Sequence, residues 1–253
     1  MLNRLLRVVT PLMGRWPARP LRTAGPLLAL SVAATSISDV ATASDFGGAA
    51  GLSSQLVDRG IALTRDTPVL QGTLFWLPSP GWSVNVSASS ALNAPGKVLM
   101  VAASLSRSWT LSDDWQMQAE VLRYSYPTDR INRLFNRNEA SLGWNYRDRL
   151  SISLAAFQMP DSGLRPRWYG ATDLTAHQPL IGALSLSAGI GISQAPPAMY
   201  GLKYASHYHY GHAGLIYTTG HWNVELERVF SNSRTGYPGR GIWPWVASVS
   251  RCF

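Results

Sequence analysis

The chain has 253 residues, of which only 14% are charged, and its formal net charge is +8. Ten tryptophans and ten tyrosines are spread along it, whereas no run of 18 apolar residues occurs, which argues against helical membrane spans. Cys252 is the only cysteine, so an internal disulfide and a cysteine-based metal cluster are excluded.

The first 43 residues are predicted to form a secretory signal peptide. Five arginines come first, an apolar run over residues 24–34 follows, and the small triplet Ala41-Thr42-Ala43 ends the segment, in the order typical of an exported protein. An amphipathic transit segment is the alternative, and three prolines among the arginines disfavour it because they would interrupt a helix. Without this segment 17 Lys and Arg face 13 Asp and Glu, a charge of +4. These basic residues are dispersed, so we expect no nucleic-acid partner.

Apolar and polar residues alternate with a period of two along the rest of the chain. In one segment Leu184, Leu186 and Ile190 alternate with serine and glycine, which separates an apolar face from a small polar one. Segments of roughly ten residues with this pattern suit the strands of a membrane barrel, although a soluble antiparallel sandwich alternates too. Ten, twelve or fourteen strands are compatible with the pattern, and residues 44–49 are predicted to be a linker. The twelve predicted strands are residues 50–62, 68–77, 82–91, 97–109, 115–126, 137–146, 149–158, 165–179, 182–193, 207–218, 221–231 and 242–253.

Two features favour a membrane barrel over a soluble sandwich. Aromatic residues such as Trp82, Trp115 and Trp222 lie at strand ends, where they suit girdles at the two membrane interfaces. The predicted links are alternately short and long, as expected for periplasmic turns and outside loops. We therefore predict one all-β domain over residues 44–253, an antiparallel transmembrane β-barrel of about twelve strands in the bacterial outer membrane, surrounded by outer-membrane lipids.

The C-terminal strand ends on an aromatic residue, Phe253, and has one largely apolar face. This ending resembles the C-terminal signal by which outer-membrane barrels are recognised for assembly, so Phe253 is the predicted assembly signal and the barrel-assembly machinery a predicted partner. Arg251 departs from the pattern, in which an apolar residue is usual at this position. An ordinary terminal strand of a soluble protein is the alternative.

The segments Ser53–Ala62 and Pro68–Gly72 resemble the opening of a family of exported bacterial proteins of unknown function, called the Gcw family. In that family a first strand reading like S-D-Y-x-x-R-G-x-S precedes a strand reading like P-x-x-Q-G. Here Leu56-Val57-Asp58 stands in place of the usual aromatic run. The resemblance implies a signal peptide and a β-rich, outer-membrane body, and it implies no activity.

Polar residues that alternate with apolar ones are predicted to line the lumen. On one strand Glu120 and on another Glu225 lie on the polar face, together with neutral amides. Arg59, Arg123 and Glu120 are charges that could pair across the lumen. The predicted lumen-lining residues are Gln116, Gln118, Glu120, Asn223, Glu225 and Glu227.

A His beside a carboxylate is the weak candidate for catalysis. If Thr219 and Gly220 form a two-residue turn, His212 lies opposite Glu227 on the lumen face, where the His could act as a general base. A polar pair that merely lines the lumen is the favoured alternative, because no third group is assigned. His207 and His209 are two residues apart, but no metal or cofactor is expected.

Arginines cluster in two predicted outside loops. Arginine at the outer rim could bind lipopolysaccharide phosphates or attract anionic solutes, and plain solvated loop charge is the equal alternative. The candidate anion contacts are Arg130, Arg133, Arg137, Arg165 and Arg167.

The function predicted from these features is a passive outer-membrane pore for small hydrophilic solutes. Two alternatives stay open: a barrel-embedded enzyme that modifies lipid, with His212 and Glu227 at its centre, and a non-conducting barrel with a surface-binding or structural role. An enzyme is the less favoured of these, because the serines are explained as small polar positions facing the lumen.

Overall fold

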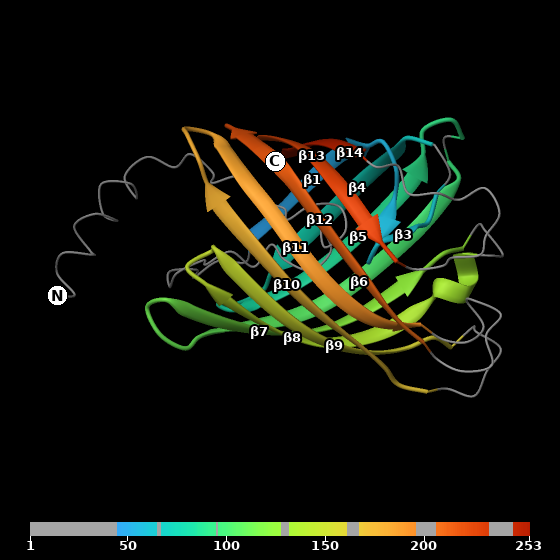
Figure 1. Ribbon diagram of the computed structural model, residues 1–253, viewed down its shortest axis with the longest axis horizontal. Coiled ribbons are helices and arrows are strands. Elements are labelled where there is room, and N and C mark those ends of the chain that lie inside the picture. The colour runs from blue at the N-terminus through green and yellow to red at the C-terminus, as the bar shows by residue number, and fades with distance from the viewer. Residues whose placement is uncertain are drawn as a thin grey trace.

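A closed antiparallel barrel makes up the protein. The computed structural model describes residues 45–64, 67–94, 96–127, 132–160, 167–195, 206–232 and 245–253. Twelve strands form the wall in the order β1-β14-β13-β12-β11-β10-β9-β8-β7-β6-β5-β4, and β1 closes it by pairing with both β14 and β4 (Figure 1). The predicted all-β barrel of twelve strands is confirmed. The residues before Asp45, which include the predicted signal peptide, lie outside the described ranges.

The wall strands are β1 (Asp45–Ser53), β4 (Val69–Leu77), β5 (Trp82–Ala91), β6 (Val98–Thr110), β7 (Trp115–Ser125), β8 (Arg137–Tyr146), β9 (Leu150–Gln158), β10 (Tyr169–Pro179), β11 (Leu184–Ala195), β12 (Ser206–Thr219), β13 (Trp222–Ser231) and β14 (Trp245–Cys252). The short strands β2 (Val57–Asp58) and β3 (Ile61–Ala62) pair only with each other, and a short 3-10 helix, η1 (Asn132–Phe135), precedes β8. Within the described part of the chain, no helix is long and apolar enough to cross a membrane.

The first strand begins earlier and ends earlier than predicted. Residues 45–49, expected to be a linker, belong to β1, whereas the end of the expected strand 50–62 turns away as β2 and β3. Glycine hides the period-two pattern here: a side chain at Gly47 would collide with the ring of Phe75, and one at Gly48 with the ring of Phe253. The small residues that make room for these rings carry no alternation signal.

Side chains on the outside of the wall are apolar and exposed. Along β13, for example, Val224 and Leu226 are exposed, while the residues that alternate with them, Asn223, Glu225 and Glu227, are buried in the lumen. Such an exterior would be unfavourable in water, and it is typical of strands that face lipid. Exposed apolar residues on other strands include Leu70, Leu74, Val86, Leu105, Val121, Leu142, Leu154, Leu174, Leu186, Ile190 and Leu215.

The two ends of the barrel differ. Links of two to four residues join the strands at one end, called the turn end below, and links of six residues or more lie at the other, the loop end. Aromatic rings gather outside the turn end, where Phe46 stacks on Trp76 with centroids 5.8 Å apart. The guanidinium of Arg251 lies 5.5 Å from the ring centre of Trp222. Arg251 thus occupies an interfacial position, which explains the departure from an apolar terminal strand.

The C-terminus completes the closure of the barrel. The backbone N–H of Phe253 donates to the carbonyl of Gly48, and the N–H of Gly48 donates to the carbonyl of Phe253, both at 3.0 Å. The Phe253 side chain is exposed on the outer face. A role for Phe253 as an assembly signal stays a prediction.

Candidate functional site

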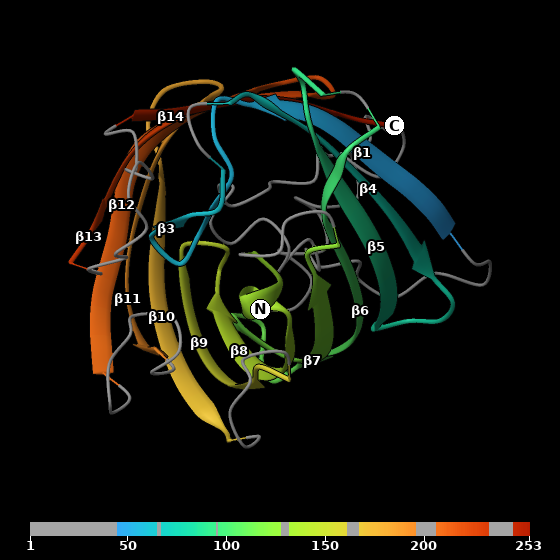
Figure 2. The ribbon, with the colours of Figure 1, turned by 90° about the vertical axis from the view of Figure 1, so that its right-hand side faces the viewer.

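The link between β1 and β4 folds back into the barrel. Residues 54–64, called the lumen hairpin below, contain β2 and β3, and Figure 2 shows this segment inside the ring of strands. Arg59 and Gly60 form its two-residue turn, with positive φ angles of 45° and 71°. The N–H of Leu63 donates to the carbonyl of Leu56 at 2.9 Å and extends the pairing.

Apolar side chains of the lumen hairpin pack against the inner wall. Leu56, Ile61 and Leu63 are at most 4% exposed and belong to one buried cluster with residues of the wall. Val57 joins a second cluster, with Val229 and Val246. Each buried aliphatic side chain contributes roughly 1.5–3 kcal/mol to holding the hairpin in place. The wall residues of the first cluster include Met100, Leu122, Tyr124, Phe157, Tyr169, Tyr208 and Tyr210.

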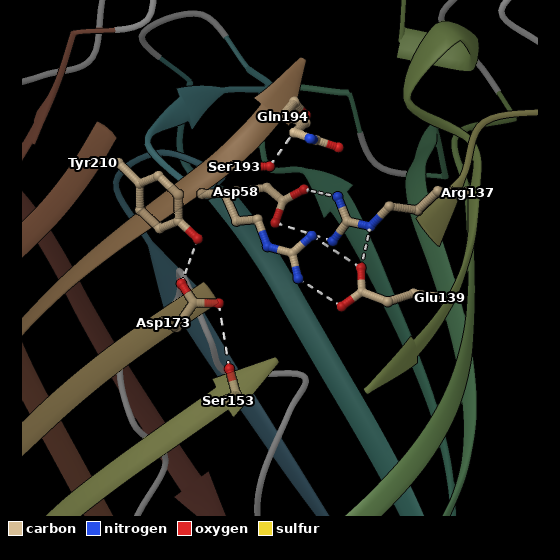
Figure 3. A network of polar contacts seen from close by, with 9 residues as sticks. Asp58, Arg137, Glu139, Ser153, Asp173, Ser193, Gln194 and Tyr210 are labelled. Carbon is tan, nitrogen blue, oxygen red and sulfur yellow. Dashed lines mark hydrogen bonds and ion pairs between the residues drawn. The ribbon is translucent and has the colours of Figure 1, made fainter. Parts of the chain in front are cut away.

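A buried ion network joins the turn of the lumen hairpin to β8. Arg59 binds Glu139 with two hydrogen bonds, at 2.6 and 3.0 Å, and Arg137 binds both carboxylate oxygens of Asp58 (Figure 3). Glu139 also lies 3.0 Å from Nε of Arg137, so the four side chains are connected. Two hydrogen bonds between one guanidinium and one carboxylate offset the energetic cost of removing both charges from water.

Aromatic rings and a second polar group surround the network. The guanidinium of Arg137 lies 4.0 Å from the ring centre of Tyr124. Farther along the wall, the hydroxyl of Tyr210 on β12 donates to Asp173 on β10, as Figure 3 shows. Gly191 makes room for this pair, because a side chain there would collide with both. The hairpin is therefore held from β8 and from β10–β12.

Asp58 of the lumen hairpin is an ionisable group whose pKa is shifted by its surroundings. Burial by itself would raise the pKa of Asp58, but the charge and hydrogen bonds of Arg137, together with the charge of Arg59, outweigh burial and lower it. Asp58 is therefore ionised at neutral pH, as the ion network requires.

The tip of the hairpin leaves no room for a side chain. Gly60 has a φ of +71°, and an added Cβ would lie 2.5 Å from Cβ of Tyr210. We expect Gly60→Ala to lower the free energy of unfolding by about 1–3 kcal/mol, or to expel the hairpin from the lumen. Tryptophan fluorescence during urea unfolding measures the change in stability, and protease digestion of the hairpin measures its expulsion. Gly72→Ala is the matched control, since no atom lies within 4 Å of its added Cβ; equal behaviour of the two variants would contradict the prediction.

Along β7 and β9 the inward-facing side chains become more exposed toward the turn end. On β7 the inward-facing Gln116 and Gln118 are half-buried, whereas Glu120, Leu122 and Tyr124 are buried. The same change occurs along β9, from half-buried Ser151 and Ser153 to buried Ala155 and Phe157. Beside β7 and β9, the lumen is therefore more open at the turn end than at the loop end, where the hairpin packs against the wall.

The residues predicted to line the lumen lie on inward faces. Asn223, Glu225 and Glu227 are buried on β13, and Glu120 is buried on β7. Arg123, suggested as a lumen charge, instead lies on the exposed face of β7 and donates to Asn138 Oδ1 at 2.7 Å. Arg123 has an odd residue number, and on β7 the even-numbered residues face inward.

His212 and Glu227 lie near each other, but in a register different from the predicted one. The β12–β13 turn is Gly220-His221, so Thr219 pairs with Trp222, and Glu227 lies opposite Gly214. Gly220, with a φ of +55°, occupies the first central position of this two-residue turn, which glycine favours. A shift of two residues keeps the same side chains facing the lumen.

The geometry around His212 does not form a catalytic relay. Its Nε2 lies 3.7 Å from Glu227 Oε1 and 3.5 Å from Ser187 Oγ. A relay requires the carboxylate at one ring nitrogen and the nucleophile at the other, whereas both groups here face the same nitrogen. All three residues are buried, with Glu227 at 0% exposure. This arrangement favours a structural polar group over a catalytic one.

The arginines expected in outside loops have different positions. The prediction is wrong for Arg137, which is the first residue of β8 and binds Asp58 inside the lumen, because its inward-facing position brings it against the hairpin. Arg133 is exposed and donates to the carbonyl of Pro127 at 2.8 Å, and Arg167 is exposed. Arg130 and Arg165 lie outside the described residues.

His207 and His209 do not assemble a metal site with their neighbours. His207 and His209 are exposed on β12, and Nε2 of His207 lies 3.3 Å from the side-chain nitrogen of Gln194. Across the described ranges, no group of three or more His, Cys, Asp or Glu side chains is arranged to hold a metal ion.

The lumen hairpin was not recognised from the sequence as a functional element. Arg59-Gly60 between apolar residues is a turn signal that could have divided the expected strand 50–62. No local signal indicates Glu139, which binds Arg59 from a position 80 residues away.

No family model matches the chain, and no curated protein sequence matches it. Among solved structures, the KdgM porin is similar over 82% of this chain and 99% of its own, with a TM-score of 0.51 and 9% identity. A second structure, the KdgM porin in complex with disordered oligogalacturonate, gives 0.51 at 8% identity, with the same shares covered. The NanC porin covers 82% of this chain and 98% of its own, with a TM-score of 0.52 and 11% identity. The chain therefore has the fold of these twelve-strand porin barrels.

Proposed function

We propose that this protein is a channel of the bacterial outer membrane for small hydrophilic solutes, and that the lumen hairpin determines what passes. The observation that carries the proposal is a closed barrel with an apolar exterior and a polar interior, in a fold shared with the KdgM and NanC porins. An apolar exterior suits lipid, and polar inward faces suit water and solutes.

The lengths of the links at its two ends give the channel an orientation in the membrane. In this proposal the turn end faces the periplasm and the loop end faces outside, as in barrels whose longer links are extracellular. Solutes would meet the hairpin first and the half-buried glutamines of β7 afterwards. Outer-membrane lipids and the barrel-assembly machinery are the proposed partners, and Arg133 and Arg167 are exposed positions at the loop end for contact with lipopolysaccharide.

Membership of the Gcw family is part of the proposal. Arg59-Gly60, which match the R-G of the family pattern, form the tip of the lumen hairpin, and Arg59 belongs to its ion network. A structural requirement for these two residues supports the idea that the shared motif encodes an inserted hairpin.

Single-channel conductance in planar bilayers tests the proposal. We expect the protein purified from membranes to migrate differently before and after heating and to give small, steady currents, because the hairpin leaves only a narrow passage. A heat-dependent shift without current, both in this protein and in a variant lacking the hairpin, would contradict a channel. That result would leave the lipid-modifying enzyme and the structural barrel as alternatives. An assay of fatty-acid release from vesicles would distinguish the two.

A further inference from the structure

Below the lumen hairpin, the lumen contains more acidic than basic side chains. Both inward-facing arginines of the described residues, Arg59 and Arg137, are bound to carboxylates of the ion network. The other carboxylates have no guanidinium partner among the ion pairs of the described ranges. They are Glu120, Asp173, Glu225 and Glu227, all buried.

Glu225 and Glu227 are the closest pair of these acidic residues along the chain. They lie two residues apart on the inward face of β13, and they are 3% and 0% exposed. Oε1 of Glu225 and both carboxylate oxygens of Glu227 accept no hydrogen bond from the described residues. Ser248 donates to the other oxygen of Glu225 at 3.5 Å, and His212 lies 3.7 Å from Glu227. Buried acceptors of this kind are usually satisfied by a donor or an ion.

A small cavity lies beside Glu225. It has a volume of about 90 Å³, and its lining includes Glu225, Ser87, Ser248 and Leu56 of the lumen hairpin. The hydroxyl of Ser87 is buried and has no hydrogen-bond partner in the described part of the chain. The cavity has room for an ion with a small number of waters, and hydroxyl and carboxylate oxygens are ligands that hard cations prefer.

We infer that Glu225, with Ser87 and Ser248, forms a transient site for small cations next to Glu227, and that these two glutamates make the channel cation-selective. This inference rests on the proposed channel function and names its solute class. Ionised carboxylates that lack a guanidinium partner attract cations into a narrow, low-dielectric passage and repel anions. An acidic saccharide such as the oligogalacturonate bound by the KdgM porin carries the charge that this lumen disfavours.

The reversal potential under a potassium chloride gradient at neutral pH tests the inference. We expect potassium permeability to exceed chloride permeability by roughly tenfold, the lower end of the enrichment produced by a charged cleft. In Glu225→Gln/Glu227→Gln the ratio should fall toward one, and Glu225→Gln alone should give a smaller fall. Asp113→Asn is the control, because it removes a carboxylate from an exposed turn and should leave the ratio unchanged.

The outcomes distinguish the inference from the channel on which it depends. Steady current with no preference for potassium, or with a preference for chloride, would overturn the inference and leave the channel in place. An unchanged ratio in both glutamine variants would also overturn it, since the selectivity would then arise elsewhere. No current in the wild type or in a variant lacking the hairpin would overturn the channel itself.

Discussion

Replacing residues 55–63 by a short Gly-Ser linker should raise the single-channel conductance several-fold. The lumen hairpin fills the loop end of the barrel, where its apolar side chains and ion network occupy the space between β8 and β12. The wall does not depend on the hairpin for closure, because β1 pairs directly with β14 and β4. Conductance in planar bilayers measures the effect, and heat-dependent gel mobility verifies that the barrel is intact.

The matched control is Val57→Ala, which trims one contact but keeps the hairpin and its four ionic side chains. This variant should conduct like the wild type. If the linker variant retains its heat-dependent mobility and its conductance does not rise, the hairpin is not the constriction.

The period-two pattern was sufficient to predict most of the wall. Strands such as β5 and β8 carry clear alternation between apolar and small polar residues, and their predicted bounds, 82–91 and 137–146, agree with the structure. Alternation is a local consequence of one face meeting lipid and the other the lumen, so a single sequence contains it. In β1 the same rule fails, because Gly47 and Gly48 are selected by the rings that pack on them.

The contents of the lumen could not be predicted in the same way. Alternation indicates that Glu139 faces inward, but it does not indicate which side chain comes across the lumen to meet it. Arg59 and Glu139 are 80 residues apart, and Asp58 and Arg137 are 79 apart. Their pairing depends on the hairpin folding back into the barrel, which is a property of the tertiary structure.

Arg137 shows why an arginine-rich segment was misread. It follows Arg130 and Arg133, so its charge suggested an exposed loop. The structure instead makes it the first inward-facing residue of β8, with its charge compensated by Asp58 and Glu139. A buried arginine and an exposed one have the same sequence neighbourhood here, and only the partner distinguishes them.

Arg137→Ala should have the largest effect of any single substitution in the ion network. It leaves the carboxylate of Asp58 in an apolar environment without its guanidinium partner, and it removes the contact with the ring of Tyr124. Removing one partner of a buried pair costs about 3–5 kcal/mol, which exceeds the packing contribution of any one aliphatic residue of the hairpin. We therefore expect the free energy of unfolding in urea to fall by about this amount, or the hairpin to leave the lumen and the conductance to approach that of the linker variant.

Two further variants determine whether the unpaired charge is the cause. Arg137→Ala/Asp58→Ala removes both charges and should recover part of the lost stability, because no uncompensated carboxylate is left. Arg147→Ala breaks an exposed arginine–aspartate pair at the turn end, where Arg147 Nε lies 2.5 Å from Asp114, and solvent should screen its effect. If Arg137→Ala is as mild as Arg147→Ala in both stability and conductance, the network does not hold the hairpin. The apolar clusters around Leu56 and Val57 must then hold it alone.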